Sequence, residues 1–143
     1  MCPLLFFNLD CRNKETNETE KVNRVIYTLI DADNHSDLDA VLRSYTDSIE
    51  FYPTGREFTK GIDKIRNNYT QLFKNNRLSI TTEILETRIY GKDAVVTGIN
   101  RGILRSLTDS TVKNIDDKYI ALLICNAGKE WRIDKLIWGI HHW

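Results

Sequence analysis

The sequence predicts one α+β domain, in which three helices precede a long, mostly antiparallel sheet that curls around an apolar interior. Two observations support this fold class. Before residue 76 most apolar residues recur with a period of about 3.6, as in amphipathic helices, and beyond it they alternate as in strands. The alternating segments are joined by short turns, which require antiparallel neighbours. The helices are therefore expected first and the main sheet second.

The first helix is expected to begin near Asn17. Glu20 follows Asn17 by three residues, and this spacing resembles the capping box of helix starts, with Asn in place of Ser or Thr. Residues 1–16 are expected to form an N-terminal arm, which leaves 17–143 as the single domain. The apolar stripe of this helix consists of Val22, Val25, Ile26, Leu29 and Ile30.

The second helix is expected to begin at Ser36. Asp37 and Asp39 then lie in its first turn, where the helix dipole favours carboxylates. Its expected buried face consists of Leu38, Val41, Leu42 and Tyr45.

A short strand is expected over 48–52, and it ends at the turn formed by residues 53–55. A third helix follows Gly61, and the asparagines at 75 and 76 close it. The apolar positions of this third helix recur at helical spacing and are Ile62, Ile65, Tyr69, Leu72 and Phe73.

Four long segments with strand-like composition complete the chain, and the polar stretch 108–117 is expected to form a loop between the second and the third. Gly98 and Gly102 lie inside the second segment, where glycine is typical of a bulge or sharp bend. Such points allow a long sheet to curl. The four segments are 78–90, 94–107, 118–125 and 131–143.

Several of these strands carry apolar residues on both faces. Ile120 and Leu122 point to one side of the third segment, while Tyr119 and Leu123 point to the other. Three helices cover only one side of a sheet, so a second subunit is the simplest cover for the other side. We therefore expect a homodimer through the outer sheet face.

Composition and charge exclude several classes of protein. Lys+Arg and Asp+Glu both number 20, so no net charge recruits nucleic acid or an acidic membrane. Three cysteines without a CxxC pair argue against a disulfide framework or a zinc knuckle. The apolar residues near the N-terminus lack the basic region of a signal peptide, and no apolar run reaches the length of a membrane span. A cytoplasmic protein is therefore expected.

Five motifs along the chain resemble, in this order, the NTF2-like superfamily and in particular its SnoaL-like branch. The resemblance extends over roughly 21–138. Each motif is weak when taken singly, and the five together are specific for the fold but not for an activity. The motifs are Asn34–Asp39, Tyr45–Phe51, Gly61–Arg66, Tyr90–Val96 and Gly128–Ile133.

This resemblance implies a cone-shaped barrel in which three helices pack on a curved sheet. The concave sheet face and the helices of such proteins enclose a pocket, and the convex face often dimerises. Its members include steroid isomerases, polyketide cyclases, dehydratases, epoxide hydrolases and binding modules without enzymatic activity. The fold alone therefore does not settle the function.

The resemblance also implies a test for the catalytic groups of the ketosteroid isomerases, which are a carboxylate base, a tyrosine and a protonated aspartic acid. In this chain the base position falls at Tyr52 or Pro53, neither of which is a carboxylate. Leu29 stands where the tyrosine is expected, and the acid position falls near Ile120. The isomerase set is absent.

Other proton carriers are weak candidates. Asp31 lies one helical turn beyond Tyr27 on the same face, and a dehydratase-like His–Asp pair could join Asp31 to His141 or His142. Asp134 is interpreted as a strand charge paired with a neighbouring cation. Three histidines, two of them adjacent, do not form a metal site, and no motif indicates a cofactor.

A set of polar and aromatic residues is expected to line the pocket. Two interpretations stay open, since the tyrosines either contact a ligand or fill the core and hydrogen-bond each other. The resemblance also matches Tyr45 and Tyr69 to residues that support the catalytic tyrosine of the isomerases. The expected pocket residues are Tyr27, Asp31, Tyr52, Tyr69, Asn100, Tyr119 and Trp138.

Three functions are compatible with these observations. The first is binding of a small hydrophobic molecule in the cone by a homodimer. The second is an isomerase, cyclase or dehydratase that acts on a hydrophobic carbonyl or cyclic compound by general acid/base chemistry. The third is a protein-association module. Titratable groups hydrogen-bonded inside the cone, with a perturbed pKa, would favour the enzyme.

Overall fold

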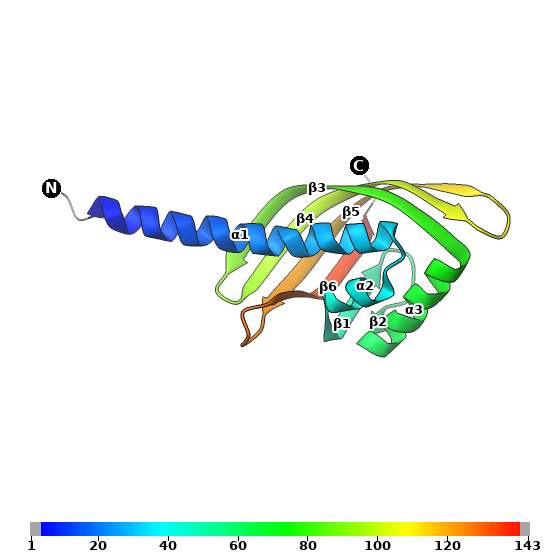
Figure 1. Cartoon of the computed structure of the whole chain (residues 1–143), viewed down its shortest axis with the longest axis horizontal. Helices are drawn as coiled ribbons and strands as arrows, with labels where there is room; N and C mark the ends of the chain where they lie inside the picture. Colours follow the sequence, from blue (N-terminus) through cyan, green and yellow to red (C-terminus); the bar gives the residue numbers. More distant parts are fainter. Residues whose placement is uncertain (1–3, 141–143) are drawn as a thin grey trace.

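A computed structural model of the 143-residue chain describes the backbone of residues 4–140 and the side chains of residues 16–139. The predicted α+β architecture is confirmed: helices pack on one face of a curved six-stranded sheet (Figure 1). The helices are α1 (Leu4–Asn34), α2 (Leu38–Arg43) and α3 (Ile62–Asn75). The strands are β1 (Tyr45–Pro53), β2 (Thr59–Lys60), β3 (Asn76–Tyr90), β4 (Asp93–Ser106), β5 (Val112–Cys125) and β6 (Trp131–Ile140).

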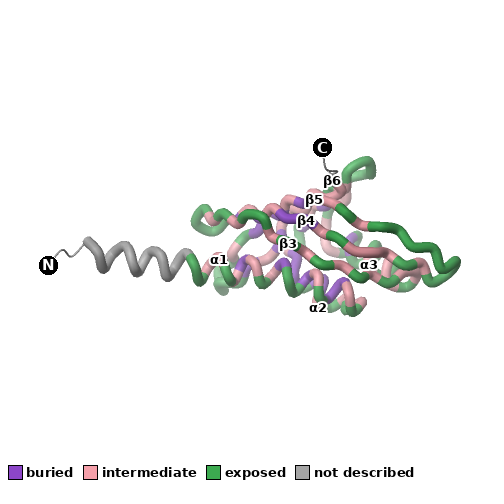
Figure 2. The backbone as a smooth tube through the Cα atoms, turned by 90° about the horizontal axis from the view of Figure 1, so that it is seen from above, coloured by how far each residue is buried: buried purple, intermediate pink, exposed green. Residues whose placement is uncertain are grey.

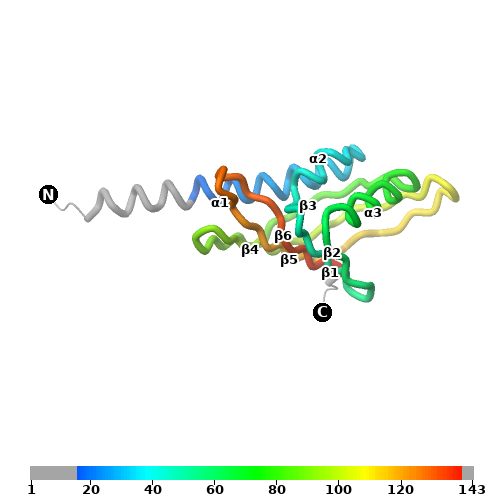
Figure 3. The backbone as a smooth tube through the Cα atoms, turned by 90° about the horizontal axis from the view of Figure 1, so that it is seen from below, coloured from blue at the N-terminus to red at the C-terminus, as the bar shows by residue number. Residues whose placement is uncertain are grey.

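The strands follow the order β2-β1-β6-β5-β4-β3 across the sheet. Every neighbouring pair is antiparallel except β1 and β6, which run parallel. The sheet curves along α1, while α2 and α3 lie toward one end of it (Figures 1 and 3). The helices and the concave sheet face thus enclose a cone-shaped interior.

Side chains from α1, α2, α3 and the concave face of the sheet form one continuous core. The buried residues are purple in Figure 2. Val22, Ile49, Ile65 and Ile133 are among its fully buried members. None of the helices in the described part combines the length and the apolar content that crossing a membrane requires.

The expected start of the first helix is wrong, because α1 already begins at Leu4 and the stretch Asn17–Glu20 lies inside it. A capping motif marks a helix start only where the preceding backbone is not helical. Whether residues 1–16 act as an arm stays a prediction, because their side chains before Thr16 lie outside the described residues.

The second helix is shorter than expected, and Tyr45 does not belong to it. Asp37 caps α2, its carboxylate accepting a hydrogen bond from the Ala40 backbone N–H at 3.1 Å. The helix ends at Arg43 because the backbone N–H of Ile133 donates to the Ser44 carbonyl at 2.8 Å. This bond places the chain beside β6, and Tyr45 becomes the first residue of β1.

The expected loop over 108–117 is also wrong beyond its first residues, because β5 begins at Val112 and pairs with β4 from there. The Ser106 N–H donates to the Thr111 carbonyl at 2.9 Å, which closes a short turn. Most of the start of β5 is exposed and carries no apolar alternation, so the composition alone resembled a loop.

Two glycines let the strands approach closely where the sheet curls. A Cβ on Gly98 would lie 2.3 Å from the Tyr119 Oη, and the bulge of β3 lies directly opposite Gly98. Gly102 has a φ of +154°, and a Cβ there would lie 1.9 Å from the Ser79 carbonyl oxygen. Both positions therefore require glycine.

Candidate functional site

The inward face of α1 ends on a carboxyl group. Val22, Ile26 and Leu29 are buried at successive helical turns, and one turn further the same stripe reaches Asp33, which is only 8% exposed. The Asp33 Oδ1 atom is buried and has no hydrogen-bond partner among the described residues. Buried charged residues are rare unless they are paired, so Asp33 is the exceptional residue of the interior.

Asn34, the residue after Asp33, fixes the end of α1 against the sheet. The Asn34 side-chain amide donates to the Ile80 carbonyl at 2.8 Å, and its Oδ1 accepts from the Ile80 N–H at 2.8 Å. This pair of bonds joins the helix to the middle of β3. It holds the last turn of α1, and Asp33 with it, on the concave side of the sheet.

Two tyrosines meet in the same interior. The Tyr45 and Tyr69 hydroxyls, from β1 and α3, are 2.8 Å apart and hydrogen-bonded. The Tyr45 ring is 1% exposed and lies 5.2 Å, centroid to centroid, from the Phe51 ring. Phe51 in turn contacts Trp138 at 4.9 Å in an edge-to-face arrangement. The aromatic cluster thus surrounds the hydroxyl pair with apolar surface.

Burial changes the acidity of these groups. Desolvation raises the pKa of Asp33 to about 7, from an ordinary value of 3.8. Burial, followed by the nearby charge of Asp33, raises the pKa values of Tyr45 and Tyr69 well above 10. Near neutral pH both tyrosines keep their protons, so the hydrogen-bonded pair retains one free O–H donor, while the Asp33 carboxyl can both give and accept a proton.

Further polar atoms lie on the concave face of the sheet. The Tyr119 hydroxyl and the Thr82 Oγ1 are 3.0 Å apart, and burial raises the pKa of Tyr119. Asn100 pairs with Thr82 across the β3–β4 ladder, and its buried Oδ1 has no partner in the described part of the chain. Asn100 Oδ1 and Asp33 Oδ1 are thus unpaired acceptors, and Ser36 Oγ is the third buried polar side-chain atom without a partner among the described residues.

Comparison with known proteins bears on the fold. No family model matches the chain, and no curated protein sequence matches it either. A ketosteroid isomerase-like protein from Erwinia carotovora atroseptica has a similar structure, with a TM-score of 0.78 and 21% identity over 85% of this chain and 94% of the other.

Two further solved structures are similar. An NTF-2 like protein of unknown function from Shewanella oneidensis has a TM-score of 0.67 and 20% identity, over 85% of this chain and 98% of its own. The chain has the NTF2-like fold. A candidate scytalone dehydratase from Novosphingobium aromaticivorans has a TM-score of 0.79 and 11% identity, over 92% of this chain and 93% of its own. At these identities the similarity establishes the NTF2-like fold alone.

The NTF2-like cone brings together only some of the residues expected from the sequence. Tyr69, Asn100, Tyr119 and Trp138 face its interior, on α3 and the concave sheet face. His141 lies outside the described residues.

Three of the expected pocket residues face outward instead. Tyr27 is 51% exposed, and the Asp31 side chain is 77% exposed and lies 3.4 Å from His35. Tyr52 lies on the outer face of β1, where its hydroxyl donates to Glu50 at 2.8 Å. Tyr27 and Asp31 do share a helix face, as expected, but that face points away from the sheet.

Asp134 has a structural role, in agreement with its interpretation as a strand residue, although its partners are hydroxyls. Its carboxylate accepts hydrogen bonds from Thr46 at 2.7 Å and from Ser48 at 3.2 Å. Among the described residues no three His, Cys, Asp or Glu side chains come together as metal ligands would.

Sequence reasoning missed Asp33, although a signal for it was present. The apolar stripe of α1 continues by one turn from Leu29 to Asp33, and the carboxyl is therefore placed among the buried positions. The sequence favours Asp31 as a pocket residue instead, because Asp31 shares a helix face with Tyr27. The sequence does not predict that Tyr45 lies on a strand, because its position depends on the pairing of β1 with β6.

Proposed function

We propose that the NTF2-like cone binds a small, uncharged and mainly hydrophobic molecule, and that Asp33 exchanges a proton with it. The observation that carries this proposal is a buried carboxyl with a pKa of about 7 and an unpaired Oδ1. A group with a pKa near the working pH is suited to general acid/base catalysis.

The surroundings of Asp33 support a particular kind of ligand. An unpaired acceptor in a desolvated site favours a ligand that donates a hydrogen bond to it, such as a hydroxyl or an acidic C–H next to a carbonyl. The Tyr45–Tyr69 pair supplies one free hydroxyl donor, while Phe51 and Trp138 supply apolar contact. An anion would be repelled by ionised Asp33, so an uncharged ligand is favoured.

The proposed reaction is an isomerisation. Ionised Asp33 accepts a proton from one ligand atom and returns it to another, so the carboxylate is regenerated and no other reactant is consumed. Asp33 and Tyr45 are both buried. A ligand therefore reaches them only when neighbouring side chains move aside. Of the similar structures, one belongs to a ketosteroid isomerase-like protein and another to a candidate dehydratase.

The test combines ligand detection with isotope exchange. Native mass spectrometry of the purified protein would detect a retained hydrophobic molecule. A panel of cyclic ketones is then incubated with the protein in D₂O, and deuterium incorporation is followed by NMR. We expect incorporation into at least one ketone, its loss in Asp33→Asn, and its retention in the matched variant Asp31→Asn. A ketone that binds without exchange would overturn the proton transfer.

We also propose that the protein is a homodimer through the outer sheet face. Ile120, Leu122 and Ile137 are only partly buried and lie on this face, which no described helix covers. Sedimentation at micromolar concentration should give a dimer for the natural chain and a monomer for Leu122→Glu. A clean monomer of the natural chain would contradict this proposal.

A further inference from the structure

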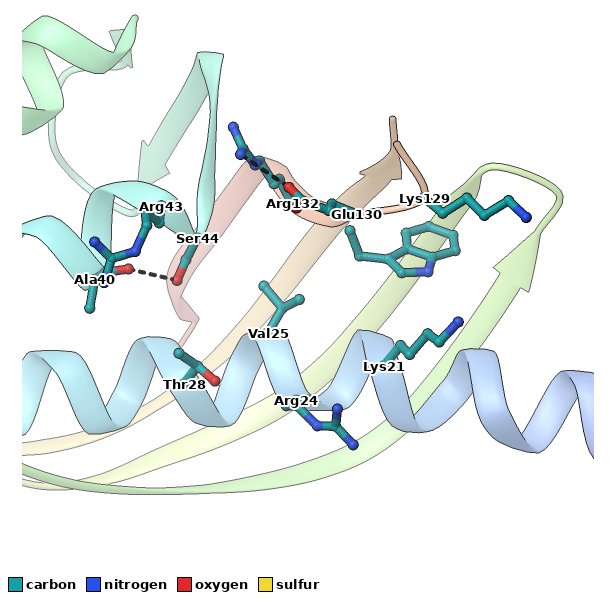
Figure 4. Close-up of a pocket in the computed structure, with 11 residues that line it drawn as sticks. Lys21, Arg24, Val25, Thr28, Ala40, Arg43, Ser44, Lys129, Glu130 and Arg132 are labelled. Carbon is teal, nitrogen blue, oxygen red and sulfur yellow. Dashed lines mark hydrogen bonds and ion pairs between the residues drawn. The ribbon is translucent and has the colours of Figure 1, made fainter. Parts of the chain in front are cut away.

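A groove outside the cone interior lies between α1, α2 and the turn that joins β5 to β6 (Figure 4). Its volume is about 510 Å³. Figure 4 shows basic side chains on all three elements, and Val25 points from α1 toward the β5–β6 turn. The lining residues with ionisable side chains are Lys21, Arg24, Arg43, Lys129, Glu130 and Arg132.

The charge of this groove differs from that of the whole chain. Five of the lining residues are basic and one is acidic, whereas the chain carries equal numbers of basic and acidic residues. Arg132 lies 3.3 Å from Glu130, and Lys21 lies 3.1 Å from Glu18. Those two cations are therefore partly neutralised.

The carboxylate of Glu18, which pairs with Lys21, is engaged a second time. It accepts a hydrogen bond from the Trp131 indole N–H at 2.9 Å, and this bond, followed by that from Lys21, lowers its pKa. Among the described side chains no carboxylate forms an ion pair with Arg24 or Arg43. Among the described residues that line it, the groove thus carries an excess of positive charge.

The local backbone explains only part of this arrangement. Arg43 lies in the last turn of α2, where the helix dipole favours a cation. Arg24 lies far from either end of α1 and has no such role. Lys129 has a φ of +63°, a conformation in which glycine or asparagine is favoured over lysine.

We propose that this groove binds the phosphate groups of a small, water-soluble phosphorylated molecule. The volume lies within the range of roughly 300–1,000 Å³ that is common for small-molecule sites. Arginine guanidinium groups match the oxygens of a phosphate in a bidentate geometry. Val25 and Ala40 supply apolar contact for the remainder of the ligand. This site is separate from Asp33 and does not depend on the proposed proton transfer.

Isothermal titration calorimetry with pyrophosphate at low ionic strength tests the proposal. The double variant Arg24→Gln/Arg43→Gln is expected to bind pyrophosphate at least about tenfold more weakly than the natural chain. The matched control is Arg56→Gln/Arg105→Gln, which removes the same charge from two exposed arginines outside the groove. It should bind as the natural chain does. Circular dichroism confirms that each variant is folded.

Three outcomes would overturn the proposal. One is the absence of saturable pyrophosphate binding, and another is an equal loss of binding in the control, which would indicate diffuse surface charge. The third is binding to vesicles of mixed phosphatidylserine and phosphatidylcholine without binding of pyrophosphate. Isotope exchange at Asp33 should be unchanged in the groove variant, so the two proposals can fail separately.

Discussion

Replacing Asp33 with asparagine removes a carboxyl that folding transfers from water into the cone, and its effect on stability should depend on pH. A rise of the pKa from 3.8 to about 7 corresponds to roughly 4 kcal/mol. The folded chain holds this proton between about pH 4 and pH 7, where the unfolded chain releases it. The natural protein therefore loses stability as the pH rises through this window, and the loss is complete above about pH 7.

The expected result is a stability difference between the variant and the natural chain that grows with pH. Urea unfolding followed by circular dichroism gives the free energy of unfolding of each protein at several pH values. Asp33→Asn should differ little near pH 4 and should be more stable by up to about 4 kcal/mol near pH 8. Asp31→Asn, at an exposed position on the same helix, is the control and should keep the natural pH dependence.

A difference that does not change with pH would refute this reasoning. It would mean that the Asp33 carboxyl ionises in the folded protein as it does in water. The burial of Asp33 would then not control its protonation, and its proposed role would lose its basis.

Three further changes test the arrangement around Asp33. Tyr45→Phe and Tyr69→Phe should each lower the free energy of unfolding in urea by about 1 kcal/mol. Both variants remove the same hydrogen bond, so the double variant should lose less than the sum, and additive losses would contradict this. Gly98→Ala should cost roughly 1–3 kcal/mol, because its Cβ would overlap the Tyr119 ring, and an unchanged melting temperature would contradict the close packing. Asn34→Ala should lower the free energy of unfolding by roughly 1–3 kcal/mol and should speed hydrogen exchange of the Ile80 backbone amide. Unchanged exchange at Ile80 would exclude this anchoring role.

The fold could be predicted where one face of an element is apolar and the other is polar. The helix after Gly61 is such a case, and the structure has it. The turn after residue 53 was predictable for another reason, its proline and glycine. The position at which α2 ends could not be predicted, because the spacing of Leu38, Val41 and Tyr45 is also that of one helix face, which would continue through Tyr45. The Ser44 carbonyl instead accepts a hydrogen bond from the Ile133 backbone N–H, and Ile133 lies far along the chain.

The site was harder to predict than the fold. Aspartate is expected at the surface, so a carboxyl on α1 was assigned to the pocket only through its neighbour Tyr27. Tyr69, Asn100 and Trp138 were placed correctly on the inward side, because they follow the apolar periodicity of their elements. Asp33 breaks that rule, since it occupies an inward position with a polar group. The apolar spacing of α1 already places this residue among the buried positions, and the three-dimensional structure adds that its Oδ1 has no hydrogen-bond partner among the described residues.

The most direct test of the central claim is an NMR titration of the Asp33 side-chain carboxyl carbon, assigned by comparison with Asp33→Asn. The account predicts a midpoint near pH 7 in the folded protein, because burial without a partner disfavours the charged form. It also predicts that a ketone bound in the cone shifts this midpoint. A midpoint near pH 4, as for a carboxyl in water, would contradict the account.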